Sequence, residues 1–396
     1  MKDPSLMLEF TQRLERFQRL LDESEFDGAL MVQRTDLYYL TGTDQNGLLW
    51  VPRDGKALFM VRKSYERALQ DGFVENTVPL KSLSHVPDLI KNHSRIVPRR
   101  IGLEMDVLPA RLYLSYRDLF PLGELADVST LIRSVRMVKS HREISLVRRA
   151  AEIADDLFKT VPRLLKESET EIDLALRAEA FYRSRGHPGI SPMRAFNVHN
   201  LYGHILAGPG SAMPSASPGP TGGRGPGPFL SHGAGRGKIK PHEPVLFDYT
   251  SNVEGYISDQ SRIYALGDLP DKFSRAHHVM MEVQEAVAKA GKPGVTAGDL
   301  YELALDVVKK AGLFEGFMGH PQPVPFVGHG VGLELDEWPI IGKNSEQVLE
   351  KGMIIALEPK IIFPGEGVAG VENTFVVGQD GMEKLGRYPD DIVMVS

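Results

Sequence analysis

Residues 245–262 read VLFDYTSNVEGYISDQSR, in which two strand-like runs flank the turn-forming sequence SNVEG. Asp248 and Asp259 lie eleven residues apart, one in each run. A hairpin brings both carboxylates to one face, where they can chelate a cation together. Taken alone, two aspartates at this spacing more often belong to a solvated turn, so the interpretation depends on the rest of the chain.

Three further phrases hold acidic or imidazole side chains. His329 lies between glycines in GHGVGLELDEWP, Glu358 lies in ALEPK within an apolar run, and Glu372 lies in GVENTF. A buried carboxylate without a partner is costly, so both glutamates need a cation or a proton. A lone histidine, in contrast, is more often a satisfied polar residue than a ligand.

The joint pattern is a stronger signal than any single residue. Four carboxylates and one imidazole form an oxygen-rich ligand set, contributed by Asp248, Asp259, His329, Glu358 and Glu372. Such a set suits two divalent ions of intermediate hardness, such as manganese, cobalt, zinc or iron. The sequence therefore predicts a hydrolase site that holds two metal ions.

Bulk properties bound the remaining possibilities. A chain of 396 residues is too long for one ordinary core and predicts two domains, 1–134 and 135–396. The net charge of −6 does not favour nucleic acid as a partner, and the absence of cysteine excludes disulfides and thiolate metal sites. Charges near the N-terminus and the lack of a long apolar run predict a cytoplasmic enzyme without a membrane partner.

The two predicted domains differ in their patterns. Before residue 134, a helical repeat of apolar residues precedes a strand at 27–32, a hairpin around Asp54-Gly55 and a strand at 100–105, which indicates a small α/β domain. A new helix begins at a capping box formed by Ser140 and Glu143. From there, paired amphipathic helices alternate with antiparallel-looking strands, so the second domain is predicted to be α+β.

A long segment rich in glycine and proline, residues 208–237, interrupts the second domain. Its composition excludes a helix or a central strand. We expect a mobile surface loop or lid, with a role at the entrance of the site, because long loops inside compact domains are often functional.

With these phrases in place, the chain resembles the family of creatinase, prolidase, aminopeptidase P and methionine aminopeptidase, the "pita-bread" fold. The resemblance covers the whole chain, with weaker motifs in the N-terminal domain. It implies that all five residues named above ligate metal. It also implies a homodimer that acts on a small peptide substrate.

The resemblance implies metal-assisted hydrolysis by a hydroxide that bridges two ions. Glu358 is implied to shuttle the proton as well as to bind metal. His232, sixteen residues before Asp248, is similar to a proton-donating histidine of the family after a gap of one residue, although a loop histidine is the alternative reading.

The chain departs from the family's peptidases at three points. Asp336 stands seven residues after His329, and Pro325 four residues before it, where peptidases of the family often carry histidines. An ionised aspartate cannot donate a hydrogen bond, as those histidines do. The arginine that commonly precedes the last ligand is also missing from GVAGVEN. Substrate orientation is therefore expected to differ, and Asp336 and Pro325 are expected to lie near the substrate.

Three functions remain open on this basis. The leading hypothesis is a proline-directed exopeptidase, an Xaa-Pro dipeptidase or Xaa-Pro aminopeptidase. The second is a relative that acts on a small non-peptide substrate, by carbon–nitrogen hydrolysis like creatinase or by elimination like dimethylsulfoniopropionate lyase. The third is a binding protein without catalysis, which the five retained ligands disfavour.

Overall fold

The computed structural model describes residues 2–199 and 201–396. Contacts divide the chain into two compact units, Met1–Arg136 and Met137–Ser396, each described here by itself. This division lies two residues after the one expected from the sequence. Among the described residues, no helix combines the length and apolar character that a bilayer-spanning segment requires.

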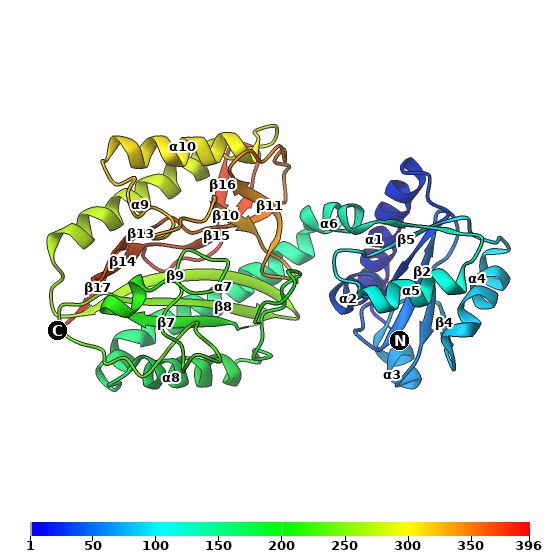
Figure 1. Cartoon of the computed structure of the whole chain (residues 1–396), viewed down its shortest axis with the longest axis horizontal. Coiled ribbons are helices and arrows are strands. Elements are labelled where there is room, and N and C mark those ends of the chain that lie inside the picture. The colour runs from blue at the N-terminus through cyan, green and yellow to red at the C-terminus, as the bar shows by residue number, and fades with distance from the viewer. Residues whose placement is uncertain (1, 200) are drawn as a thin grey trace. The chain divides into compact units, whose positions relative to one another are not determined.

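The first unit is built on a six-stranded mixed sheet in the order β4-β3-β2-β1-β5-β6 (Figure 1). Its strands are β1 Gly28–Met31, β2 Gly47–Pro52, β3 Leu58–Val61, β4 Asn76–Pro79, β5 Arg100–Leu103 and β6 Glu124–Asp127. Its helices are α1 Pro4–Glu23, α2 Arg34–Thr41, α3 Tyr65–Asp71, the short η1 Leu83–His85, α4 Val86–Ser94, α5 Ala110–Leu119 and α6 Ser129–Met137. Strands β2 and β3 pair in antiparallel fashion, so the hairpin predicted around Asp54-Gly55 is confirmed.

The second unit contains two helix pairs. The first pair is α7 His141–Lys166 and α8 Glu171–Ser184, and the second is α9 Asp271–Ala290 and α10 Ala297–Lys310. A short 3₁₀ turn, η2 Gly208–Ala212, lies between the two pairs in the sequence. Helix α7 begins at the predicted capping box, in which the Ser140 hydroxyl accepts from the Glu143 amide and the Glu143 carboxylate accepts from the Ser140 amide. This reciprocal pair satisfies two backbone donors and defines the start of the unit's longest helix.

Strands of three sheets lie between the helix pairs. A four-stranded sheet has the order β17-β9-β8-β7, a five-stranded sheet β11-β10-β12-β15-β16, and β13-β14 forms a separate ladder. Their bounds are β7 Gly203–Ala207, β8 Val245–Val253, β9 Tyr256–Leu266, β10 Phe326–Gly330, β11 Glu337–Gly342, β12 Ile354–Leu357, β13 Lys360–Phe363, β14 Gly367–Gly370, β15 Asn373–Val377, β16 Met382–Lys384 and β17 Val393–Val395.

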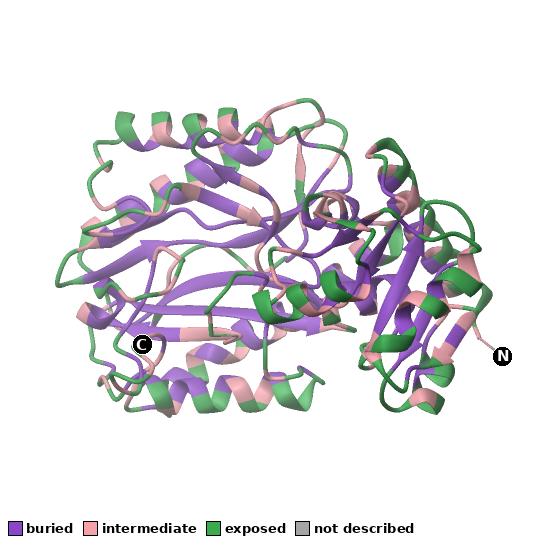
Figure 2. Ribbon diagram, turned by 45° about the vertical axis from the view of Figure 1, so that its right-hand side comes forward, coloured by how far each residue is buried: buried purple, intermediate pink, exposed green. Residues whose placement is uncertain are grey.

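The layers of this unit explain its strand composition. Helices α7 and α8 pack on β7, β8 and β9, whereas α9 and α10 pack on the strands of the other sheets (Figure 1). The central strands β8, β9, β12 and β15 are therefore buried along nearly their whole length, in agreement with the purple strands of Figure 2. The predicted α+β, pita-bread architecture of the second domain is confirmed.

One strand-like run has a different structure from the one its pattern indicates. The sequence GMIIALEPKIIF looks like one strand, but it forms β12 and β13, which belong to different sheets. Pro359 lies at the break, where proline cannot donate a hydrogen bond to a ladder. The break leaves Glu358 directly after β12 and makes Lys360 the first residue of β13.

Candidate metal centre

The hairpin of β8 and β9 brings Asp248 and Asp259 to one face, as predicted. In the antiparallel register, Thr250 lies opposite Asp259 and Asp248 lies opposite Ser261. Residues two apart on a strand point to the same side, so Asp248 shares a face with Thr250 and hence with Asp259. Both aspartates are buried.

The other three predicted ligands reach the same place from the second sheet. His329 lies in β10, Glu358 directly follows β12, and Glu372 lies between β14 and β15. An isolated bridge between Ser261 and Glu372 joins the two sheets at this point. The structure thus brings all five residues together from segments that lie far apart in the sequence.

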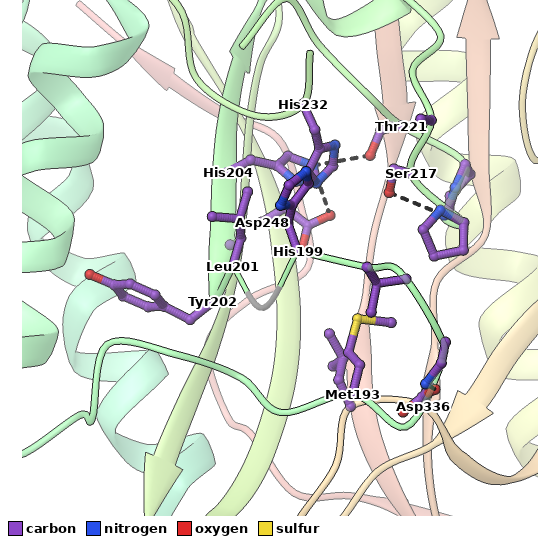
Figure 3. A pocket seen from close by; sticks show the side chains of 18 of the residues that line it. Met193, His199, Leu201, Tyr202, His204, Ser217, Thr221, His232, Asp248 and Asp336 are labelled. Carbon is purple, nitrogen blue, oxygen red and sulfur yellow. Dashed lines mark hydrogen bonds and ion pairs between the residues drawn. The ribbon is translucent and has the colours of Figure 1, made fainter. Parts of the chain in front are cut away.

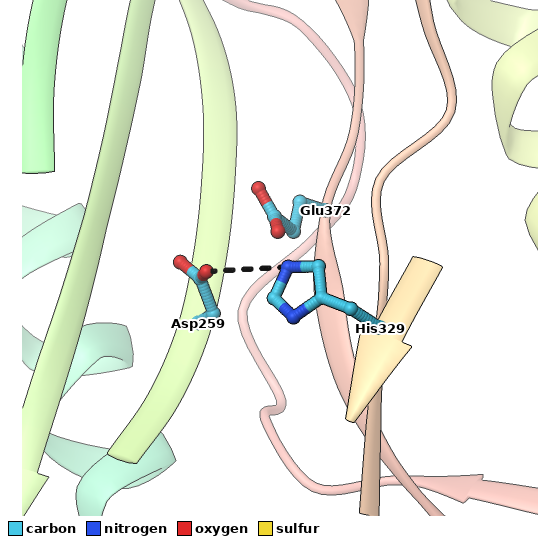
Figure 4. Close-up of side chains that lie close together, drawn as sticks. All are labelled: Asp259, His329 and Glu372. Carbon is cyan, nitrogen blue, oxygen red and sulfur yellow. Dashed lines mark ion pairs between the residues drawn. The ribbon is translucent and has the colours of Figure 1, made fainter. Parts of the chain in front are cut away.

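Three of these residues form a compact candidate site for a cation. Asp259, His329 and Glu372 each offer one ligand atom, and these atoms lie within 4.8 Å of one another (Figure 4). The Nε2 atom of His329 is 4.0 Å from Asp259 Oδ2 and 3.6 Å from Glu358 Oε1. Imidazole and carboxylate donors in this arrangement suit a divalent ion of intermediate hardness.

A side chain that the sequence reasoning did not single out occupies the other part of the cluster. The amino group of Lys360 donates to Asp248 Oδ2 at 3.0 Å, to Glu358 Oε2 at 2.9 Å and to Glu372 Oε2 at 3.1 Å. Its side chain is only 1% exposed. Three of the five predicted metal ligands therefore already contact a positive charge that the protein itself supplies.

Burial and mutual charge strongly affect the protonation of these groups. Burial, with the charges of Asp248 and Glu358, raises the pKa of Asp259 to about 7. Burial also raises the pKa of Glu372 well above its usual range. Burial works in the same direction on Asp248, but the charges of Lys360 and His204 outweigh it and lower that pKa. Asp259 and Glu372 are thus the two carboxylates that most need a further cation.

The candidate ligand residues line a cavity of about 500 Å³. Its wall includes Asp248, Asp259, His329, Glu358 and Glu372, together with parts of the glycine- and proline-rich segment. The predicted role of this segment at the site therefore agrees with its position, since residues 216–221 and 228–232 line the cavity.

Two further histidines face the cavity from the side of Asp248 (Figure 3). His232, which the sequence pointed to, has its ring 5.1 Å from the ring of His204. His204 lies 3.7 Å from Asp248 Oδ2 through its Nε2 atom, which also contacts the Thr221 hydroxyl at 3.1 Å. Burial lowers the pKa of His232, and it lowers that of His204 to about 4, so both rings are neutral near pH 7.

Two of the three departures from the family pattern, Asp336 and Pro325, have different positions. Asp336 lines the cavity, and its carboxylate accepts from the backbone amides of Arg194 at 2.7 Å and Ala195 at 3.1 Å. Pro325 is not among the described residues that line the cavity, and its carbonyl accepts from the Lys343 amide. Asp336 therefore fastens a cavity-lining segment, whereas Pro325 lies behind the wall.

A buried carboxylate anchors the long segment. Glu171, at the start of α8, accepts from the amides of Ala207 at 2.7 Å and Gly235 at 2.8 Å, and burial raises its pKa. Two backbone hydrogen bonds lie beside it: the Glu171 amide donates to the Gly237 carbonyl, and the Ile172 amide donates to the Gly235 carbonyl. These contacts fix the segment three residues from His232, so the loop is attached to the scaffold at that end.

Of the two residues that reasoning from the sequence missed, only Lys360 left a signal in it. Lys360 stands two positions after Glu358 in an apolar run, and a lysine buried in such a run needs carboxylate partners. His204 stands on β7 directly opposite Asp248 of β8. Only the strand pairing identifies His204, because nothing in its local sequence points to the metal ligands.

Comparison with known proteins agrees with this geometry. The family model for Metallopeptidase family M24 matches residues 145–379, and the model for the Creatinase/Prolidase N-terminal domain matches residues 13–138. The Xaa-Pro dipeptidase of Pyrococcus furiosus is 26% identical over 96% of this chain and 99% of its own length. That of Lactobacillus helveticus is 31% identical over 74% of this chain and 72% of its own.

A solved structure gives the same result for the fold. The prolidase from Pyrococcus horikoshii has a TM-score of 0.79 at 24% identity, over 96% of this chain and 99% of that one. The creatinase-like first domain and the pita-bread second domain expected from the sequence are both confirmed. The M24 match spans more than half of the chain and contains all five predicted ligands, and from this agreement we conclude that the chain belongs to metallopeptidase family M24.

Proposed function

We propose that this protein is a metal-dependent, proline-directed exopeptidase that acts on Xaa-Pro dipeptides or on the N-terminus of Xaa-Pro peptides. The observation that carries the proposal is the cluster of Asp259, His329 and Glu372 at the wall of a cavity large enough for a small peptide. The relatives named Xaa-Pro dipeptidase support the choice of substrate.

When bound, a divalent ion supplies Lewis acidity toward the scissile carbonyl and lowers the pKa of a water molecule. We propose that Asp259, His329 and Glu372 hold it. Manganese, cobalt, zinc and iron all suit these donors. Glu358 lies beside His329, with its Oε1 atom 3.6 Å from the imidazole, and is proposed to accept the proton of the attacking water.

His232 is proposed to donate a hydrogen bond to the oxygen on which negative charge develops. Its neutral ring retains one N–H donor, and the ring faces the cavity beside His204 (Figure 3). Apolar residues form much of the remaining wall and provide contacts for a proline ring; they include Leu201, Phe229, Phe326, Leu335 and Ile340.

Hydrolysis of Xaa-Pro dipeptides and Xaa-Pro-Yaa tripeptides by manganese- or cobalt-loaded protein tests the proposal. We expect metal-dependent turnover that falls by several orders of magnitude in His329→Ala and Asp248→Ala. Relative rates on the two peptide classes distinguish a dipeptidase from an aminopeptidase. Exposed His278 on α9 offers a matched control, and His278→Ala should leave the rates unchanged.

A non-peptide substrate is the second candidate, and Asp336 is the observation that favours it. Both of its carboxylate oxygens accept backbone amides, so it cannot replace a donor histidine toward a peptide. If loaded protein leaves every peptide intact, small guanidino, amide and sulfonio compounds are the next substrates to assay.

We further propose a homodimer located in the cytoplasm, as the family resemblance and the sequence suggest. Sedimentation equilibrium of the full chain measures the oligomeric state. A mass of 43.9 kDa in solution, that of a single chain, would contradict the dimer.

A further inference from the structure

The cluster of carboxylates already contains a cation that belongs to the chain. Oxygens of Asp248, Glu358 and Glu372 converge on the amino group of Lys360 at 2.9–3.1 Å. They come from three different segments, so the ammonium holds together parts of the chain that lie far apart in the sequence. Such convergence of negatively charged oxygens on one point is the arrangement that a bound cation requires.

The stem of Lys360 is built into the fold and leaves little freedom to withdraw. Lys360 begins β13 and pairs with Gly370 of β14. A Cβ atom at Gly370 would lie 2.9 Å from Lys360 Cγ, so the stem fills the space that a side chain would otherwise occupy. Because the residue is 1% exposed, its charge cannot move into solvent without opening the cluster.

The charge balance leads to the same conclusion. With all four carboxylates ionised, as metal binding requires, four carboxylates and one ammonium leave three formal negative charges among Asp248, Asp259, Glu358, Glu372 and Lys360. One divalent ion reduces this to a single negative charge, whereas two ions beside the ammonium would reverse the sign. Ammonium and metal also repel each other at the few ångströms that separate neighbouring ligands.

We infer that the ammonium of Lys360 takes the place of one metal ion, so that the chain binds a single divalent ion, at Asp259, His329 and Glu372. The centre is then a lysine–metal pair rather than the two-ion site expected from the sequence. Three carboxylate oxygens around Lys360 accept hydrogen bonds from its amino group. A second metal ion would need the same oxygens as ligands, at about 2.0–2.2 Å.

Counting ions tests this inference without any peptide, although it rests on the proposed function for the presence of metal. The full chain is loaded with Mn²⁺, freed of excess ion, and analysed by elemental mass spectrometry and by electron paramagnetic resonance. We expect one ion per chain and the spectrum of an isolated Mn²⁺. In Lys360→Gly, which removes the charge and leaves room, we expect two ions and the spectrum of a coupled pair.

Lys384→Ala serves as the control, because that lysine pairs with Asp390 outside the cluster and its loss should leave the count at one. Two ions in the wild-type chain would overturn the inference whether or not Lys360→Gly folds. One ion in both chains would show that something other than the ammonium excludes the second, and none in the wild type would refute the single site. Failure to cleave peptides would count against the proposed function alone.

Discussion

At the scale of single residues, the site combines groups whose charges depend on burial. His232 is proposed to donate a hydrogen bond to the substrate, which a neutral imidazole does through its single N–H. Its lowered pKa keeps the ring neutral, and its neighbour His204 is neutral as well. Together they present uncharged donors beside a strongly acidic cluster.

Replacement of His232 tests its role in turnover. We expect His232→Phe, which keeps a planar ring but removes the N–H donor, to lower kcat for the best peptide by about 10²–10³-fold, with the metal content unchanged. Steady-state kinetics and metal analysis on the same preparation measure both quantities. His278→Phe on exposed α9 is the control, and a normal kcat in His232→Phe would show that turnover does not need His232 as a donor.

A second histidine gives a pH dependence of stability. His187 is buried against the ring of Tyr202, and burial, with the charge of Arg183, lowers its pKa from 6.5 to about 4. The unfolded chain therefore takes up the proton first. The contribution of neutral His187 to the free energy of unfolding is complete above about pH 6.5. It falls below that pH and is lost once the pH has fallen through about 4.

Between pH 6.5 and 4, the free energy of unfolding should decrease less in His187→Phe than in the wild type, by on the order of 1–3 kcal/mol. Urea denaturation at a series of pH values measures the slope, which is independent of any constant loss from the missing hydrogen bond to Gly189. His278→Phe should keep the wild-type slope. An unchanged slope in His187→Phe would mean that the ring titrates normally in the fold.

At the scale of elements, the start of α8 determines where the long segment lies. Glu171 accepts two backbone amides while buried, one from β7 and one from the segment itself. Hydrogen bonds to a charged acceptor contribute about 1.5–3 kcal/mol each. The helix therefore holds a segment that has few apolar side chains of its own with which to pack.

We expect Glu171→Ala to destabilise this attachment by about 2–4 kcal/mol and to release residues 208–237. Limited proteolysis should then cut within the segment many times faster than in the wild type, and turnover should fall because His232 loses its position. Glu302→Ala, an exposed glutamate on α10, is the matched control. Equal cleavage rates in the two variants would show that other contacts hold the segment.

At the scale of the whole molecule, the five candidate metal ligands all belong to the unit Met137–Ser396. A ligand that binds only the folded state stabilises it by about 2.7 kcal/mol at one hundred times its Kd. Addition of Mn²⁺ is therefore expected to raise the melting temperature of this unit, and removal by a chelator to reverse the change. The transition of Met1–Arg136 should not respond.

Differential scanning calorimetry of the full chain with metal and with chelator measures this difference. His329→Ala should abolish the shift, because it removes the imidazole ligand from the cluster of Asp259 and Glu372. A shift of equal size in His329→Ala would place the bound ion elsewhere.

Local patterns were sufficient for much of the architecture. The capping box of Ser140 and Glu143, the hairpin of Asp54-Gly55 and the shared face of Asp248 and Asp259 follow from interactions within a few residues or from strand alternation. Glu358 and Glu372 were also visible as candidate ligands, because carboxylates in apolar strands need a partner wherever those strands lie. The other three candidate ligands followed from the joint pattern and the family resemblance.

The partner of those carboxylates could not be read from local patterns. Strand pairing puts His204 opposite Asp248, and the break at Pro359 puts Lys360 at the start of a separate ladder, from which its amino group reaches Asp248. Both contacts join residues far apart in the chain, so their energies depend on packing and not on local propensity. The sequence thus established which residues can bind a cation, whereas the fold determined that one of the cations near them is a lysine of the same chain.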